Sequence, residues 1–176
     1  MKTSTIDNKV NEFLNTYLSK LFFKATLLLI FVLNTTIALA QSETNKAELK
    51  VDKDRAVRSA PSEGTYYKMV LNNINRTDTF YLSTLNVNSS STNPDKSDIS
   101  ENVNLEIVFL DQNLKPISEI TVKSGETGRF FARVNVPKGT PYDKWSSNKI
   151  IAKSKSNSSY KVDTVLHTLV ISNNDK

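Results

Sequence analysis

The chain of 176 residues contains no cysteine and a single histidine, His167. Without cysteine it can form no disulfide, and it has no thiol to carry a lipid after an export leader, so we do not expect a lipoprotein. One histidine and no thiol leave too few ligands for a zinc or copper site. We therefore expect neither a metal centre nor a cofactor.

The sequence also lacks the motifs of a hydrolase. It contains no Gly-x-Ser-x-Gly turn to hold a serine nucleophile, and a histidine within an apolar strand, such as His167, is usually structural. Asp95, Asp98 and Glu101 offer oxygen ligands, but their spacing does not match a calcium loop. We expect no catalytic residue and no enzymatic activity, and a hydrolase is the least favoured alternative.

Residues 1–40 have the pattern of a secretory leader. Lys20 and Lys24 precede the apolar run 25–33, and Ala38-Leu39-Ala40 then places small residues before a cleavage point. A basic region, a short apolar region and an A-x-A site together indicate a signal-peptide helix that is removed after export. The alternative is an uncleaved anchor. No later apolar stretch reaches the ~20 residues that a membrane-spanning helix needs.

The charge of the chain is mildly basic. The net charge is +5, and removing the leader's four lysines and two acidic residues leaves 19 basic and 16 acidic residues, a net charge of +3. This balance does not indicate nucleic-acid binding. Lys149, Lys153 and Lys155 form a stripe, which is ordinary for the wet face of a sheet.

The segment 124–137 gives the clearest evidence for secondary structure. Gly125 and Gly128 bracket a polar turn, and Pro137 ends the segment. Apolar side chains fall on every second residue, at Phe130, Ala132, Val134 and Val136. Successive side chains of a strand point to opposite faces, so this period predicts a strand with one buried face and one wet face.

Similar alternation predicts further short strands, with no convincing helix after the leader. They are expected at 65–73, 79–83, 103–109, 117–122, 149–155 and 160–172. The polar segment 41–64 holds a possible first edge strand at Leu49 and Val51. The stretch 86–102 has no period and almost no apolar residue, which predicts a mobile loop, and the tail 173–176 is expected to fray.

Seven or eight short strands separated by turns predict an all-β fold. We expect an immunoglobulin-like sandwich of about seven strands over residues 65–172, in which two sheets with Greek-key connections bury alternate residues. A domain of this size buries enough surface to fold without disulfides, and we expect it to be monomeric.

Several short motifs occur in an order that resembles a known family. They are Tyr67 to Asn73 as an alternating strand, Asp-x-Phe-x-Leu at 78–82, Gly-Glu-Thr at 125–127, Val-Asn-Val-Pro at 134–137, Ile-x-Ala-x-Ser at 150–154, and Asp163. This order resembles the immunoglobulin-like, fibronectin type III-like domains of bacterial exported proteins, of the type associated with carbohydrate-binding modules in alpha-galactosidases. The resemblance covers about residues 55–172 and implies a non-catalytic spacer or binding module. The chain departs from the family at Asn75, where a glycine is usual, and in the length of 86–102.

Two pairs of side chains are candidates for contact with a ligand or partner. Tyr142 and Trp145 lie in the corner after Pro137, where aromatic rings can stack on sugars; the alternative, which we prefer, is that Trp145 caps the open end of the core. Tyr81 and Ile151 are expected on the outward faces of neighbouring strands. Exposed apolar side chains there can seed a partner interface, although single ones are common on any surface.

These features predict an exported, non-catalytic module that binds a protein or glycan at the bacterial cell envelope, in the periplasm or outside the cell. The alternative is a periplasmic chaperone or assembly factor that completes a client sheet through an edge strand. The alternative requires an unpaired edge with outward apolar residues, and the charges beside Leu49 and Val51 disfavour it at the first strand.

Overall fold

The computed structural model describes residues 17–20, 22, 24, 46–74 and 76–172. The chain divides into two compact units, Met1–Thr44 and Asn45–Lys176. The described residues of the first unit are helical. The apolar run and the cleavage site of the expected leader, like the tail 173–176, lie outside the described residues, so leader cleavage stays a prediction. Within the described part of the chain, no helix has the length and apolar character needed to cross a membrane.

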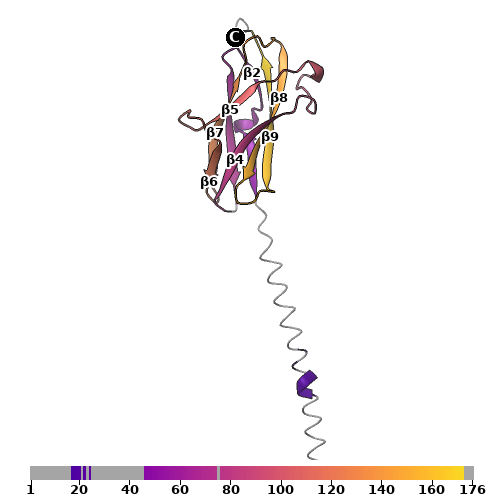
Figure 1. Ribbon diagram of the computed structural model, residues 1–176, viewed down its shortest axis with the longest axis vertical. Coiled ribbons are helices and arrows are strands. Elements are labelled where there is room, and N and C mark those ends of the chain that lie inside the picture. The colour runs from indigo at the N-terminus through magenta and orange to yellow at the C-terminus, as the bar shows by residue number, and fades with distance from the viewer. Residues whose placement is uncertain (1–16, 21, 23, 25–45, 75, 173–176) are drawn as a thin grey trace, which may run out of the picture. The chain divides into compact units, whose positions relative to one another are not determined.

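The second unit is a sandwich of two β-sheets (Figure 1). One sheet has the order β1-β3-β7-β5 and the other the order β2-β9-β8-β4-β6. The strands are β1 (Ala47–Val51), β2 (Val57–Ala60), β3 (Thr65–Asn73), β4 (Asp78–Asn86), β5 (Glu106–Leu110), β6 (Glu119–Val122), β7 (Thr127–Asn135), β8 (Lys144–Ser154) and β9 (Lys161–Val170). The predicted all-β, immunoglobulin-like class is confirmed, with nine strands in the described residues where about seven were expected.

The expected strand within 124–137 is β7, at the centre of the four-stranded sheet, between β3 and β5. Its inward side chains are at most 1% exposed: Phe130, Ala132 and Val134. Gly125 has a φ of 72°, as the preceding turn requires. Gly128 serves a different purpose, because it lies within β7 where an added Cβ would stand 2.6 Å from Cγ2 of Val122.

The chain changes sheets near its start. β1 is an edge strand, as predicted, and it buries Leu49 and Val51. The 3-10 turn η1 (Asp52–Asp54) contains left-handed backbone at Lys53 and leads into β2, which runs parallel to β9 in the other sheet. The sequence analysis missed β2, because its four residues show no alternation of buried apolar side chains. The sandwich therefore includes part of the segment 41–64.

Buried polar groups fix one end of the sandwich, and one of them joins the two sheets. The Asn73 side-chain amide donates to the Val122 carbonyl at 2.9 Å. The Asp78 carboxylate accepts from the hydroxyls of Ser154 at 2.5 Å and Ser156 at 2.7 Å. Burial opposes the ionisation of Asp78, but these hydrogen bonds outweigh it and hold its pKa below the ordinary value. The Asn, Asp and Ser positions of the family-like motifs thus have structural roles.

Candidate binding surfaces

An apolar stripe runs across the outer surface of the five-stranded sheet. We call it the five-stranded face, and it consists of Val57, Tyr81, Leu85, Ile151, Val165 and Leu169. These side chains alternate along their strands with core residues, so they point away from the core. The register places Ile151 opposite Ser83, Leu85 opposite Lys149, and Lys149 opposite Val165. The predicted pair Tyr81 and Ile151 is therefore brought onto one surface, on neighbouring strands.

The apolar residues of this face are substantially exposed. Leu85 is 55% exposed, Val57 49% and Tyr81 44%. Ile151, Val165 and Leu169 are partly exposed. β9 was expected to be central or covered on both faces, and the structure places it between β2 and β8. Its outward residues Val165 and Leu169 extend the surface beyond the two residues that the sequence singled out.

Lysines lie both within and beside this surface, and Lys149 stands between Leu85 and Val165. Lys149 pairs with Asp163 at 3.6 Å, and Lys155 pairs with Glu119 at 3.4 Å. The Lys155 ammonium also lies 5.3 Å from the centre of the Tyr81 ring. Contact with Tyr81, followed by the pairing with Glu119, raises the pKa of Lys155 above its ordinary value.

Two of the bordering lysines face each other directly. Lys153 lies opposite Lys161 in the β8–β9 register, and opposite Tyr81 on β4. In the described residues neither lysine has a carboxylate within ion-pair distance. Like charges placed directly across two strands repel, so this arrangement costs stability and leaves two ammonium groups available to an acidic partner.

Trp145 lies inside β8 and is only 8% exposed. It alternates with the inward Ser146 and lies opposite Leu169, on the outer side of the five-stranded sheet. The loop 86–102 covers it, and the indole N–H donates to the Asp95 carboxylate at 2.8 Å. The preferred interpretation was partly wrong: Trp145 is covered, but it lies under a loop on a sheet face and is not part of the core cluster.

The loop 86–102 has more local structure than its sequence suggested. Asn93 is 2% exposed, and the side-chain amides of Asn93 and Asn102 bond each other in both directions, at 2.9 and 2.8 Å. A 3-10 turn, η2 (Ile99–Glu101), follows Asp98, whose carboxylate accepts from the Ser100 N–H. Paired amides replace the apolar contacts that sequence periodicity detects. Its mobility stays a prediction.

Tyr142 does not join Trp145 in one site. It is 50% exposed and precedes β8, on the wall of a shallow hollow formed with the 136–140 turn. Asp143 lies between the two aromatics with a φ of 57°, and this turn separates the exposed ring from the covered one. A sugar contact at Tyr142 stays a prediction.

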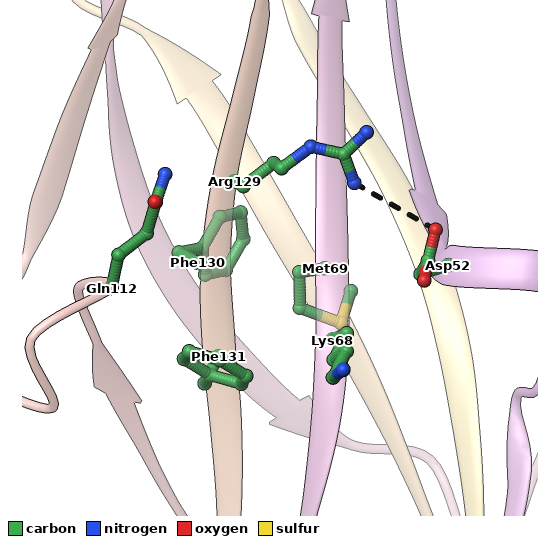
Figure 2. A pocket seen from close by; sticks show the side chains of 7 residues that line it. All are labelled: Asp52, Lys68, Met69, Gln112, Arg129, Phe130 and Phe131. Atoms are coloured by element: carbon green, nitrogen blue, oxygen red, sulfur yellow. Dashed lines mark ion pairs between the residues drawn. The ribbon is translucent and has the colours of Figure 1, made fainter.

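The outer surface of the four-stranded sheet has a different character. Tyr66 and Phe131 meet edge to face, with ring centres 6.4 Å apart, and the Arg133 guanidinium lies 5.7 Å from the Tyr66 ring centre. A neighbouring hollow on this surface has a volume of about 300 Å³. Its lining includes Phe131, Lys68 and Gln112 (Figure 2). Arg129 crosses it toward Asp52, with 3.7 Å between their charged groups (Figure 2).

His167 has a serine neighbour but no hydrolytic geometry. Its Nδ1 lies 3.0 Å from the Ser147 hydroxyl, and burial lowers its pKa below the ordinary value. Ser147 is fully buried, so its hydroxyl cannot meet a substrate. No carboxylate hydrogen bonds to the imidazole among the described residues. This arrangement agrees with the structural interpretation of His167.

The loop carboxylates are engaged with their own chain. Asp95 accepts from Trp145 and from the Ser97 N–H, and these bonds lower its pKa. The Ser100 N–H likewise lowers the pKa of Asp98. Within the described residues, no group of three or more histidine, cysteine or acidic side chains could hold a metal ion.

No protein-family model and no curated protein matches the chain. The resemblance to the alpha-galactosidase-associated type is therefore not confirmed. Solved structures share the sandwich at low identity. A family 123 glycoside hydrolase from Clostridium perfringens is 9% identical over 73% of this chain, with a TM-score of 0.47, and this chain spans only 28% of its length.

Two further solved structures share the fold at similarly low identity. A FixG-related protein from Vibrio parahaemolyticus is 12% identical, with 72% of this chain and 95% of that chain covered and a TM-score of 0.39. The periplasmic chaperone SfaE is 8% identical, with 73% and 57% covered and a TM-score of 0.39. The likeness is confined to the fold, so the function has to be argued from this chain's own residues.

Proposed function

We propose that the chain is an exported, non-catalytic module that binds a partner protein at the cell envelope through the five-stranded face. The observation that carries the proposal is the exposure of the apolar side chains that make up this face. Apolar surface is costly to expose, and a group of exposed apolar side chains on one sheet face is a common feature of protein-binding sites. The loop 86–102 covers Trp145 and leaves the neighbouring stripe open.

The chemistry of the face favours a protein over a glycan. Five of its six apolar side chains are aliphatic, and aliphatic surface packs well against another apolar protein surface, whereas sugar rings stack best on aromatics. Lys153 and Lys161 add unpaired positive charge at one end. The expected partner therefore has a flat apolar surface that is edged by carboxylates.

The test is capture of envelope proteins by the purified chain and two variants. Leu85→Asp places a charge in the stripe, and Leu114→Asp is a matched control, because both leucines are 55% exposed. We expect the same partner to bind wild type and Leu114→Asp and to be lost with Leu85→Asp. Equal capture by all three proteins, or selective capture of polysaccharide, contradicts the proposal.

A chaperone or assembly factor that acts by strand complementation is the second candidate, and the β5 edge favours it. The Ile107 backbone groups point away from β7, they have no partner in the described part of the chain, and the side chain is partly exposed. Several similar structures contain chaperones, one of them the periplasmic chaperone SfaE, so the comparisons lie nearer to this candidate, although only in fold.

The lengths of the edge strands argue against strand complementation. The four edge strands have four or five residues each, whereas β3, β4, β7, β8 and β9 have nine to eleven. Short edges limit the number of backbone bonds that an added strand can form, which disfavours strand addition. Co-purification of a client that survives Leu85→Asp would favour this second candidate over the first.

A further inference from the structure

The free edge of β6 borders a groove on the side of the molecule between the two sheets. The hollow has a volume of about 460 Å³. Its lining comes from β6, from residues 111–113 of the turn after β5, and from Arg129 of β7. It shares Gln112 and Arg129 with the hollow on the four-stranded sheet.

The backbone of β6 is unpaired on the groove side. The Leu82 N–H donates to the Ser118 carbonyl at 2.8 Å, and the antiparallel register with β4 continues from this pair. Hydrogen-bonded pairs alternate with non-bonded pairs in such a ladder. Ile120 therefore bonds to β4, whereas Glu119 and Thr121 turn their N–H and C=O groups to the free side. No partner for these groups occurs in the described residues.

A second unpaired backbone segment lines the same groove. The Phe109 carbonyl accepts from the Ile117 N–H at 2.9 Å, so Leu110 is the residue that bonds to β7, opposite Phe131. By the same alternation, the N–H and C=O groups of Arg129 point to the β5 side of β7, at a position beyond the end of β5. An extended chain in this hollow can therefore bond to backbone groups of both edges.

The wall opposite these edges is preformed. The Asp111 carboxylate accepts from the N–H groups of Asn113 and Lys115, each at 2.8 Å, and the Asp111 N–H donates to the Lys115 carbonyl. These bonds fix the turn, so the cost of ordering it is already met before a ligand arrives. Gln112 extends from this turn beside β7 (Figure 2).

We propose that this groove docks an extended segment of a partner polypeptide, which adds to the free edge of β6 as a further strand. Only an extended chain presents N–H and C=O groups at the spacing that Glu119 and Thr121 require. The partly exposed Ile117 and Ile120 offer an apolar wall to one of its side chains. The inference deepens the second candidate function by giving it a site.

The charge of the groove selects an acidic side chain at one position. The Arg129 side chain is 58% exposed and pairs only at 3.7 Å with Asp52. Two carboxylates also face the groove, but Asp111 is used by its turn and Glu119 pairs with Lys155. The guanidinium reaches toward Asp52 (Figure 2), so a ligand carboxylate binds Arg129 only in exchange for this long contact. The groove shares no residue with the five-stranded face, so variants of one site leave the other intact.

The probe is a displayed library of random decapeptides, selected on the purified protein. Thr121→Pro removes the N–H on the free side and keeps the bonds of β6 to β4, and Thr121→Val is the matched control. We expect selected peptides to alternate apolar residues with an acidic one. They should bind Thr121→Val like wild type, bind Thr121→Pro about tenfold more weakly or worse, and bind Arg129→Gln about fivefold more weakly.

Amide exchange on the wild-type protein keeps the test valid if Thr121→Pro fails to fold. Bound peptide should slow exchange at Glu119 and Thr121 more than at Ile107. Equal binding to Thr121→Pro, protection only at Ile107 or on the five-stranded face, or a selection without binders would overturn the proposal. Protection of the β6 amides by self-association, without peptide, would assign the edge to a second copy and would also overturn it.

Discussion

The two outer faces of the sandwich differ in how far their exposed side chains contact one another. On the four-stranded sheet, Tyr66 contacts Phe131, Arg133 lies over Tyr66, and Arg129 reaches Asp52. On the five-stranded face, Leu85 lies opposite Lys149 and Ile151 lies opposite Ser83, so neither faces an apolar side chain across the β4–β8 pair. A face whose side chains contact one another contributes to stability, whereas a face that stays open is available to a partner.

The loop 86–102 sharpens this contrast within the five-stranded sheet. It covers Trp145 and Ser147, where the Asn88 side chain accepts from the Ser147 N–H at 2.7 Å. It does not extend over Leu85, which stays 55% exposed. Within the described residues, the loop therefore covers one part of this outer surface and leaves Leu85 exposed.

The largest expected effect is on partner binding. Ile151→Asp should weaken binding about 100-fold, because a charge in the centre of an apolar interface is desolvated without a partner. Val108→Asp is the matched control, since Val108 is an equally outward, partly exposed aliphatic residue of the four-stranded sheet. Titration calorimetry with the captured partner measures both. Equal losses for the two variants would remove the distinction between the faces.

The converse substitution should affect stability alone. Phe131→Ala removes the ring that Tyr66 contacts, and we expect the free energy of unfolding to fall by about 1–2 kcal/mol with binding unchanged. Leu85→Ala should change it by less than about 0.5 kcal/mol. Urea denaturation provides the comparison. A larger loss for Leu85→Ala than for Phe131→Ala would reverse the roles assigned to the faces.

Substitution of the buried Asp78, which lies on neither outer face, should leave binding intact and alter the pH dependence of stability. The folded state lowers the pKa of Asp78 below its ordinary value of 3.8. Its contribution is therefore complete above that value and is lost as pH falls through the lower, folded-state pKa. Asp78→Ala should cost about 1–2 kcal/mol at pH 7 and flatten the acid limb of the stability curve. An unchanged acid limb would show that the hydrogen-bonded carboxylate is not the cause.

The smallest expected effect concerns the unpaired lysines. Lys153→Gln should weaken partner binding about two- to threefold at low salt and reduce its salt dependence. It should also raise stability slightly, because it relieves the repulsion with Lys161. Lys68→Gln, on the other sheet, is the control. Identical salt dependence in wild type and Lys153→Gln would exclude an acidic edge on the partner.

Strands with strong period-two patterns were predictable from the sequence. The expected strand 65–73 coincides with β3, and the inward residues of β7 are the ones that the pattern indicated. The alternation works there because one face of each strand packs on the core. β2 was missed because it has four residues and its position depends on pairing with β9, a contact between distant parts of the chain.

The candidate surfaces were only partly predictable. Tyr81 and Ile151 were placed correctly on one face, since period and strand neighbourhood suffice for that. The direct opposition of Lys153 and Lys161 requires the β8–β9 register, which the sequence does not display. The cover over Trp145 depends on paired asparagine amides in the loop 86–102, and amide pairs leave no periodic signal.

Photo-crosslinking in living cells tests the central claim most directly. A photoreactive residue is placed singly at Leu85 and Val165 on the five-stranded face, and at Tyr66 and Val108 on the four-stranded sheet. Binding through the five-stranded face predicts that the same partner protein crosslinks at Leu85 and Val165 and at neither of the other positions. Crosslinks to that partner at Tyr66 and Val108 alone, or at none of the four positions, would contradict the claim.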